Sequence, residues 1–459
     1  MSGILPTVAV IGAGSSGIAA IKALHEHGFD VTGFEASDRV GGNWVFGNRN
    51  GMSSNYQSLH INTSRERMEY PDFPMPKSLP DFPHHTDIAR YFDGYADFFG
   101  IRNRIRFETR IERAERRADG VWELRDQHGA THPFDFLIVA NGHHWDARWP
   151  EPAFPGSEFF EGEQMHAHDY HDEEQLRGKD VVVLGMGNSA MDIAVDASYH
   201  SKSTILAARR GAWVIPKYLF GRPLDQMGAA SPLIPFKVRQ RLTMALLRSY
   251  VGDYARYGLP KPDHKFGEAH PTVSGRILDR LAHGAITTKP NIERLDGDRV
   301  HFTDGTSVHA DLVVYCTGYK VTFPFFDPDF ISAPDNDLPL FRRVFHPDVD
   351  NVAFIGLLQP LGAVMPLAHH QSEWVADHLG GRYALPPAGA LRADIERERE
   401  KMFKRYLRSK RHTMQVDFED YLHDLGKERA AGAERARAKN FALPVARQAV
   451  GDEAVSAPV

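Results

Sequence analysis

Runs of apolar residues that end in glycine-rich turns recur along the chain and predict an α/β fold. The run from Thr7 to Ile11 leads through a glycine turn into an amphipathic stretch, which predicts a strand, a turn and a helix that stops at Gly28. A second apolar run, residues 181–184, ends in a similar turn, and a helix-prone stretch follows from Met191 to Ser198. Two such units, well separated in one chain, predict two Rossmann-like three-layer domains.

Both turns have the residues of a dinucleotide-binding loop. Bare glycines let the backbone approach a pyrophosphate, and the N-terminus of the following helix attracts its negative charge. The first turn contains Gly12, Gly14, Ser15, Ser16 and Gly17, and the second contains Gly185, Gly187, Asn188, Ser189 and Ala190. The second turn ends in alanine, so alone it would be a modest signal. Together the two turns predict that one polypeptide binds two nucleotides.

The residues after the second strand of each unit distinguish the two nucleotides. Glu35 lies where an acid accepts hydrogen bonds from the two hydroxyls of a ribose. Arg209 and Arg210 stand at the corresponding place in the second unit, where arginine favours an added 2′-phosphate through paired, charge-assisted bonds. The second nucleotide is therefore predicted to be NADPH. The alternatives are a surface glutamate and two surface arginines.

A second glycine pair follows the first unit in the segment Gly41-Gly42-Asn43-Trp44. Paired glycines allow a cofactor to approach the backbone, and Trp44 would cover it. The alternative is a Gly-Gly turn whose tryptophan belongs to the core, and the local sequence does not separate the two interpretations.

The order of the elements predicts that the second domain is inserted into the first. Residues 1–155 form the first part of one nucleotide domain, and residues 156–310 form the other, with an insertion near 220–284. Residues 311–426 return to the first domain, with a last strand at Val352–Ile355 and a helix from Ala363 to Leu379 interrupted by Pro366. Residues 427–459 are predicted to be a polar C-terminal tail.

Composition excludes several classes of function. A net charge of -6 argues against nucleic acid as a partner. The single cysteine, Cys316, excludes an internal disulfide and a cysteine-based metal site, and the spacing of the 24 histidines resembles no zinc or iron site, so no metal is predicted. No uninterrupted apolar stretch approaches the ~20 residues of a membrane span, so we expect a soluble, cytoplasmic protein without a membrane partner. The oligomeric state is left open, a homodimer included.

A motif between the two units is similar to one in a known family. Phe160-x-Gly162-x-x-x-His166-x-x-x-Tyr170 resembles the identifying motif of the flavin-containing monooxygenases. Further similar segments lie in the family's order along nearly the whole chain: 41–44, 61–64, 72–76, 141–144, 209–213, 316–319 and 356–362. The region 220–284 matches only in patches, and we expect no C-terminal hydrophobic anchor like that of the vertebrate members.

The resemblance implies FAD on the first unit and NADPH on the second. In the family, NADPH reduces the flavin, O2 adds to give a C4a-hydroperoxyflavin, and a soft nucleophile such as a sulfide or amine takes the distal oxygen. Such chemistry asks the protein mainly for a dry, protected pocket. By resemblance Ile61 and Gln359 contact FAD, and Asn62 is the catalytic residue because it matches the family's asparagine beside the flavin and nicotinamide. Without the resemblance, Asn62 would be a loop residue that caps its own backbone.

Other functions remain as alternatives. The same cofactor could convert ketones to esters by Baeyer–Villiger oxygenation, although the Baeyer–Villiger enzymes usually have a tryptophan where this chain has Tyr170. Oxidation of indole-type 2-oxo acids is a further variant. A flavin disulfide reductase shares the architecture but needs a cysteine pair, and a non-enzymatic NADPH sensor would bind cofactor without sustained turnover.

Overall fold

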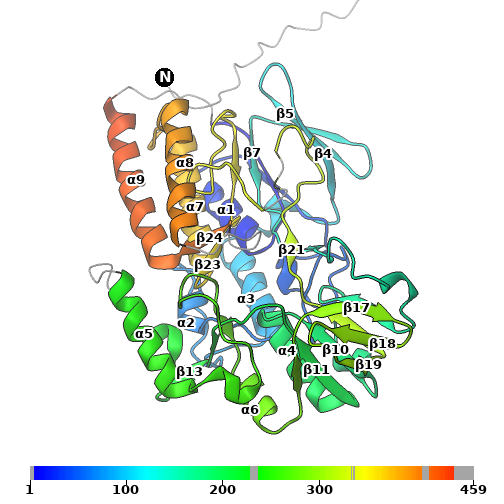
Figure 1. Cartoon of the computed structure of the whole chain (residues 1–459). Helices are drawn as coiled ribbons and strands as arrows, with labels where there is room; N and C mark the ends of the chain where they lie inside the picture. The colour runs from blue at the N-terminus through cyan, green and yellow to red at the C-terminus, as the bar shows by residue number, and fades with distance from the viewer. Residues whose placement is uncertain (1–4, 228–235, 332, 334–335, 406–412, 439–459) are drawn as a thin grey trace, which may run out of the picture.

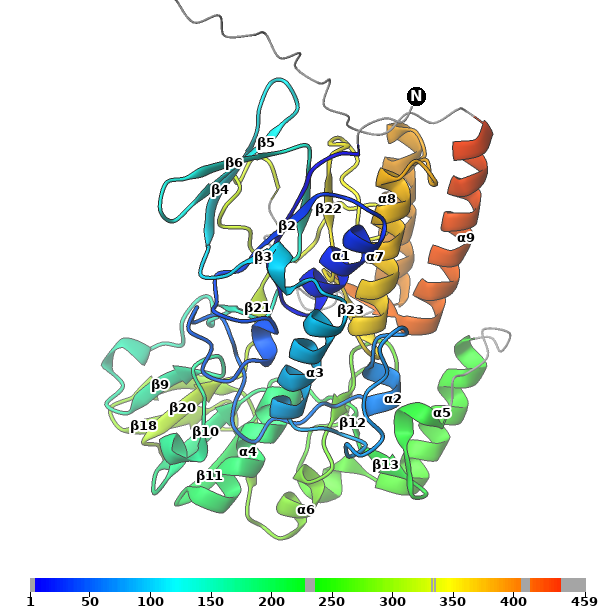
Figure 2. The ribbon, with the colours of Figure 1, turned by 180° about the vertical axis from the view of Figure 1, so that it is seen from behind.

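Two parallel five-stranded sheets form the centres of two stacked domains (Figures 1 and 2). The computed structural model of the chain describes residues 5–227, 236–331, 333, 336–405 and 413–438. The first sheet has the order β22-β7-β1-β2-β3 and the second β16-β11-β10-β20-β9, with all neighbours parallel. The predicted α/β class with two Rossmann-like three-layer domains is confirmed.

The bounds of the sheet strands follow. In the first sheet they are β1 (Val8–Ile11), β2 (Val31–Phe34), β3 (Ile105–Arg106), β7 (Phe136–Val139) and β22 (Val352–Phe354). In the second sheet they are β9 (Glu163–His166), β10 (Asp180–Leu184), β11 (Ser203–Ala207), β16 (Thr287–Lys289) and β20 (Leu312–Tyr315).

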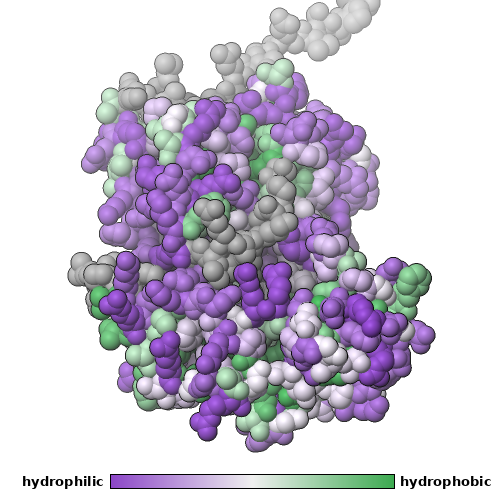
Figure 3. Space-filling view, in the orientation of Figure 1, coloured by the Kyte–Doolittle hydropathy of each residue, from purple (hydrophilic) through white to green (hydrophobic). Residues whose placement is uncertain are grey.

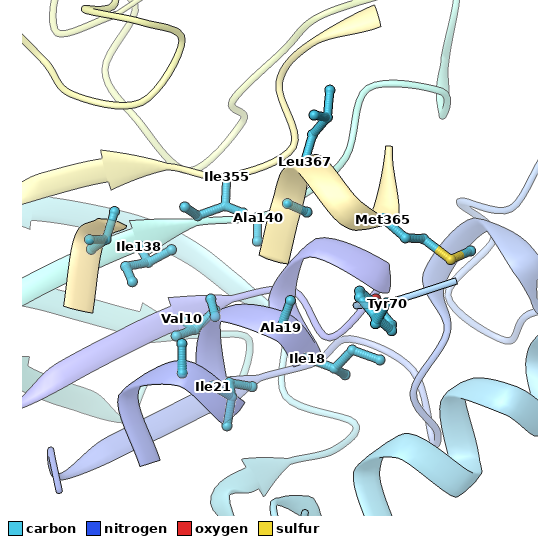
Figure 4. Packing of buried hydrophobic residues seen from close by; sticks show 14 of the residues in the cluster. Val10, Ile18, Ala19, Ile21, Tyr70, Ile138, Ala140, Ile355, Met365 and Leu367 are labelled. Carbon is cyan, nitrogen blue, oxygen red and sulfur yellow. The ribbon is translucent and has the colours of Figure 1, made fainter. Parts of the chain in front are cut away.

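The first sheet is covered on both faces. Successive side chains of a strand point to opposite faces, so Val8 and Val10 of β1 pack against helices whereas Ala9 and Ile11 pack against an antiparallel sheet. The helices are α1 (Ser15–Glu26), α3 (His85–Phe98) and α7 (Met365–Leu379), and the antiparallel strands are β4 (Ile111–Arg116), β5 (Trp122–Asp126) and β6 (Thr131–Phe134). Figure 4 shows Val10 and Ile138 of the sheet beside Ile21 of α1.

The second domain repeats these layers. Val181 and Val183 of β10 pack on the helical side, and Val182 and Leu184 pack on the antiparallel side. The helices are α4 (Asn188–His200) and α6 (Ile277–Ala282), and the antiparallel strands are β17 (Ile292–Asp296), β18 (Arg299–Phe302) and β19 (Ser307–His309). The predicted hairpin around Asp304-Gly305 is the β18–β19 turn.

The insertion is built from short elements and one long helix. These are β12 (Val214–Ile215), β13 (Tyr218–Leu219), β14 (Arg222–Pro223), η5 (Leu224–Gln226), α5 (Phe236–Val251), η6 (Tyr254–Tyr257) and β15 (Thr272–Val273). Leu247 and Val251 of α5 join the core of the second domain, whereas Leu242 and Tyr250 are exposed. In Figure 3, green residues reach the surface at the left of the lower domain, where Figure 1 places α5.

The predicted domain boundary before Asp311 differs from the structure. β20, which follows Asp311 directly, pairs with β10 and β9 of the second sheet, so the second domain extends through Tyr315. The connection back to the first domain is β21 (Tyr319–Lys320), which pairs antiparallel with β8 (Asp146–Ala147) of the outgoing connection. The two crossings between the domains therefore lie side by side.

Two predictions about the C-terminal part are corrected. Pro366 lies in the first turn of α7, where a missing N–H costs no hydrogen bond, so the helix begins there and is not interrupted. The predicted tail boundary after residue 426 falls within α9 (Phe418–Ala438), which has buried residues on both sides of that point. Its neighbours are α8 (Ala388–Arg405) and β24 (Gln415–Asp417), and residues 439–459 lie outside the described residues.

The remaining short elements are η1 (Gly42–Trp44), α2 (Arg65–Met68), η2 (Arg102–Arg104), η3 (Ser157–Phe159), η4 (Glu173–Leu176) and β23 (Gln359–Leu361). Within the described ranges, no helix combines the length and apolarity needed to span a bilayer.

Candidate functional site

The first glycine turn is shaped by backbone contacts that admit no side chain. Gly12 has φ 99°, and a Cβ there would lie 2.6 Å from the Ala140 carbonyl oxygen. A Cβ on Gly17 would overlap the Gly12 carbonyl oxygen. Gly14 is the N-cap of α1 and provides no side-chain cap, so the first N–H groups of the helix remain available to an anion. This arrangement fits the pyrophosphate of a dinucleotide.

The glycine pair of the next loop lies directly against this turn. The Gly41 N–H donates to the Ala13 carbonyl (3.0 Å), and a Cβ on Gly42 would lie 3.0 Å from Gly14 Cα. Asn43 Oδ1 accepts bonds from the backbone and the hydroxyl of Ser54. Trp44 packs, partly buried, against the core of the first domain. A cofactor could therefore approach the backbone at Gly42. The Asn43 side chain is used in hydrogen bonds within the loop, and the Trp44 side chain packs on the core.

Glu35 is placed beside the same turn and is 4% exposed. Its carboxylate accepts hydrogen bonds from the N–H groups of Ala13 (2.7 Å) and Ser37 (2.8 Å), and burial raises its pKa. Asn50 Nδ2 also donates to this carboxylate (3.4 Å), so about one of its roughly four acceptor positions remains for a ribose hydroxyl.

The segment that returns from the second domain completes the first site. Gly356, with φ 78°, faces Ser16 so closely that a Cβ would overlap the serine hydroxyl. Gln359 begins β23, which pairs with β24, and is half-buried. Ser16 and Gln359, far apart in sequence, are thereby brought to one end of the first sheet.

The second glycine turn repeats the geometry of the first. Gly185 has φ 146°, and its Cβ would lie 2.8 Å from the Cys316 carbonyl oxygen and 3.3 Å from the Cβ of buried Ala190. Gly187 is the N-cap of α4 and again supplies no side-chain cap. Asn188 Oδ1 accepts the Val273 N–H (2.9 Å), which leaves the amide NH2 of Asn188 for a nucleotide. Half-buried Ser189 lies in the first turn of α4.

Arg209 and Arg210 follow β11 and are both exposed. Arg210 Nε lies 3.6 Å from a carboxylate oxygen of Asp263 in the insertion. Among the described residues, Arg209 has no ion-pair partner, so its guanidinium is free to bind a 2′-phosphate.

The loop 56–64 of the first domain contacts the second domain at several points. Tyr56 donates to Asp192 Oδ2 (2.7 Å), and both Ser58 (2.5 Å) and Tyr170 (2.9 Å) donate to Asp196 Oδ2. Burial raises the pKa of Asp192 to about 6. Tyr170, the last residue of the motif, belongs to the second domain, as Asp196 does. It is fully buried, and its ring centre lies 5.7 Å from that of Tyr56 in the first domain.

Asn62 lies in this loop, next to fully buried Ile61. Its side chain is half-buried and makes no hydrogen bond to the rest of the described chain. The neighbouring residues are bound from the other domain: Lys217 Nζ donates to the Ile61 carbonyl (2.9 Å), and Asp225 Oδ2 accepts the Ser64 N–H (2.6 Å). Asn62 is thus placed at the junction of the domains with its amide unengaged.

Sequence reasoning missed Tyr56, Asp192, Lys217 and Asp225. Their partners are at least 130 residues away in the chain, and no short motif relates them. Lys217 and Asp225 lie in the insertion, where the hydrophobic pattern predicts little. Nothing in the local sequence distinguishes them from ordinary charged residues on the surface.

Cys316 forms part of the close packing behind the second glycine turn. It follows β20 directly, is half-buried, and contributes its carbonyl oxygen to the close contact with Gly185. Burial raises the pKa of its thiol well above the ordinary value. Cys316 therefore packs directly against Gly185 of the second glycine turn.

Two further features lie outside the predicted site residues. Asp180, His309 and Asp311 offer oxygen or nitrogen atoms within 4.8 Å of one another, but Lys202 Nζ already binds Asp180 (2.7 Å), so the group is an ion-pair cluster. A cavity of about 660 Å³ opens between α8, α9 and β24 and is lined by none of the predicted site residues.

Comparison with known families and sequences gives one consistent result. The profile described as "FMO-like: Flavin-binding monooxygenase-like" matches residues 6–435. Flavin-containing monooxygenase 5 of Oryctolagus cuniculus is 36% identical over 436 residues, which cover 91% of this chain and 81% of that protein. Flavin-containing monooxygenase 2 of Homo sapiens is 32% identical over 445 residues, which cover 92% of this chain and 82% of that protein.

Solved structures share the whole architecture. S-allyl-L-cysteine S-oxygenase from Allium sativum matches with a TM-score of 0.70 and 24% identity, covering 97% of this chain and 96% of its own. Cyclohexanone monooxygenase in its open form matches with a TM-score of 0.71 and 19% identity, covering 94% and 98%. At these identities the likeness concerns the fold.

Proposed function

Since the chain belongs to the flavin-binding monooxygenase-like family and is an FAD-dependent monooxygenase that uses NADPH, we propose that its substrates are soft nucleophiles, namely organic sulfides and amines. The observation that carries this proposal is the motif that ends in Tyr170: the chain has a tyrosine, as in the flavin-containing monooxygenases, where the Baeyer–Villiger enzymes usually have a tryptophan. An S-oxygenase and a cyclohexanone monooxygenase share the fold equally well, so the motif and not the fold favours sulfides and amines over ketones.

The two cofactors are assigned to the two glycine turns. We place FAD in the first domain, with its pyrophosphate at the N-terminus of α1, a ribose on Glu35 and the flavin toward Gln359. We place NADPH in the second domain, with its pyrophosphate at the N-terminus of α4 and its 2′-phosphate on Arg209. Bound FAD supplies the oxygen chemistry after reduction by NADPH.

The protein's own contribution is to position and shield the reacting groups. Asn62 offers a free amide, with donors and an acceptor, between the two cofactor sites. The contacts of Tyr56 and Ser58 with α4, and of the Tyr56 ring with Tyr170, hold the two domains together around this point and limit the entry of water.

A product assay tests the substrate class. The holoenzyme is supplied with NADPH and O2 together with a thioether, a tertiary amine or a cyclic ketone, and NADPH loss, hydrogen peroxide and organic product are measured. We expect a sulfoxide or N-oxide in proportion to the NADPH consumed. An ester or lactone as the main product would replace this proposal with ketone oxygenation. Peroxide alone with all three substrates would contradict both.

Substitution of Asn62 tests its predicted role. We expect Asn62→Ala to keep FAD and to be reduced by NADPH, because neither glycine turn is altered. Most of the NADPH should then appear as hydrogen peroxide, because the oxygen site has lost its amide. Loss of one oriented donor at such a site costs about 10²–10³ in rate. Coupling equal to that of the wild type would remove Asn62 from the mechanism.

A further inference from the structure

We propose that Lys217, Asp225 and Gln226 of the second domain form a clamp that positions Asn62 of the first domain. We define the clamp by these three residues and regard Lys217 and Asp225 as positioning residues. The proposal rests on the proposed role of Asn62, and it assigns to the start of the insertion a function in coupling the two domains.

The first anchor is Ile61, which precedes Asn62. Its N–H donates to the Pro83 carbonyl (3.1 Å), and its carbonyl accepts from Lys217 Nζ (2.9 Å). The lysine stem is half-buried, and Nζ also lies 4.9 Å from the centre of the Phe82 ring. Both hydrogen-bonding groups of the Ile61 backbone are therefore used, one of them by the other domain.

The second anchor is Ser64, which is fully buried. Its N–H donates to Asp225 Oδ2 (2.6 Å), and its hydroxyl accepts from Gln226 Nε2 (3.1 Å). A bond to a carboxylate is roughly twice as strong as one between neutral groups. The next residue, Arg65, is held by its own domain through the Asp81 carbonyl (2.7 Å).

Asn62 and Thr63 therefore span a gap of two residues between two fixed points. A segment this short cannot move far without breaking a bond at one end. The Leu224 N–H donates to the Lys217 carbonyl (2.9 Å), which ties the two ends of the clamp together. Any change in the relative position of the domains must then act on Asn62.

The charges of the clamp also favour a role beyond packing. Lys217 and Asp225 act on backbone groups and do not pair with each other in the structure, so each charge is directed at the loop. Asp225 Oδ1 is buried without a partner among the described residues, although such an atom costs free energy. The free-energy cost of burying this oxygen atom without a partner is explained if the Asp225 carboxylate holds a functional loop in place.

Hydrogen exchange tests the clamp directly. In the FAD-loaded protein we expect the Ser64 amide hydrogen to exchange with solvent at least about tenfold faster in Asp225→Ala than in the wild type. The reason is that the substitution removes the carboxylate that accepts the Ser64 N–H. Lys217→Met should loosen the same peptide while keeping the apolar stem. Tyr218→Phe is the matched control, because it removes another bond between the domains, Tyr218 to Asp81 (2.9 Å), without touching residues 61–64. Unchanged exchange in both clamp variants would overturn the proposal.

A second readout separates positioning from mere stability. We expect Asp225→Ala to bind FAD and to be reduced by NADPH within about twofold of the wild type, yet to release severalfold more of its NADPH equivalents as hydrogen peroxide. Asp225→Asn, which keeps an acceptor oxygen, should recover part of the coupling.

Comparison with Asn62→Ala distinguishes the two hypotheses. If Asn62→Ala uncouples but Asp225→Ala and Lys217→Met exchange faster without uncoupling, the clamp proposal is overturned and the proposed function stands. If Asn62→Ala leaves coupling unchanged, the role of Asn62 is lost, and the clamp as a positioning device is lost with it. If Asp225→Ala does not fold, Lys217→Met and Asp225→Asn decide by the same two measurements.

Discussion

Arg209 and Arg210 are neighbours in sequence but have different surroundings. Arg210 is close to Asp263 of the insertion, whose carboxylate partly neutralises it, whereas Arg209 has no ionic partner within the described residues. A phosphate that arrives at the end of β11 therefore competes with a carboxylate at Arg210 only. We therefore propose that Arg209 makes the larger contribution to 2′-phosphate binding.

We predict that Arg209→Ala raises the KM for NADPH by about ten- to a hundredfold, the range expected for loss of charge-assisted bonds to a phosphate. The KM for NADH, which has no 2′-phosphate, should stay the same. Arg210→Ala should have a smaller effect, because Asp263 already engages that side chain. Steady-state kinetics with both coenzymes checks this, and equal losses with NADPH and NADH would refute the assignment.

Asp192 is the second residue whose surroundings have a measurable consequence. Burial raises the pKa of its carboxyl from 3.8 to about 6. Between these values the folded chain holds a proton that the unfolded chain has released, so the contribution of Asp192 to stability falls as the pH rises from about 4 to about 6. Asn at this position cannot ionise and can still accept from Tyr56.

We therefore predict that the free energy of unfolding of Asp192→Asn, relative to the wild type, increases by about 2 kcal/mol between pH 4 and pH 6. Urea unfolding of both proteins over this range measures the difference. A difference that does not change with pH would show that this carboxyl titrates in the folded protein as it does in the unfolded chain, and a change in the opposite sense would show that folding lowers its pKa.

At the scale of elements, α9 shows where reading the sequence locally fails. Ala, Arg and Glu dominate the end of this helix, which is typical of a solvated tail. In the structure, Arg435 and Glu428 pair (2.5 Å), and Glu428 accepts from Tyr383 (2.8 Å). Gly432 lies against the Tyr383 ring. The helix is held by contacts with residues some 50 positions earlier, which no local pattern contains.

Two glycines of α9 provide a matched test of this packing. Gly432→Ala should lower stability by at least about 1 kcal/mol, because its Cβ would overlap Tyr383 and overpacking costs about 1–3 kcal/mol. Gly426→Ala should raise stability by about 0.5–1 kcal/mol, because Gly426 is exposed with nothing near its Cβ position and alanine favours a helix. Thermal unfolding of both variants gives the signs. Equal shifts would mean that α9 does not pack on Tyr383.

At the scale of the whole molecule, the local units were predictable and their junction was not. Strand, turn and helix around Gly12 and Gly185 follow from apolar runs and glycines that lie within 20 residues, and both form as expected. The domain boundary was placed one strand too early, because apolar periodicity marks β20 as a strand without saying which sheet it joins. The clamp around Asn62 joins residues more than 150 positions apart, so only the folded chain reveals it.

The two connections between the domains, which pair through β8 and β21, bear on how such a chain could exchange a domain in evolution. Asp146 lies opposite Lys320 and Ala147 opposite Tyr319, so the inserted domain begins and ends at the same place on its host. A unit with adjacent ends can be exchanged as one cassette without rerouting the host polypeptide. A chimaera that received another coenzyme domain here would keep the path of its flavin-domain polypeptide unchanged. The new domain would have to reproduce the bonds that Lys217, Asp225 and Gln226 make to the flavin domain, together with those of Asp192 and Asp196.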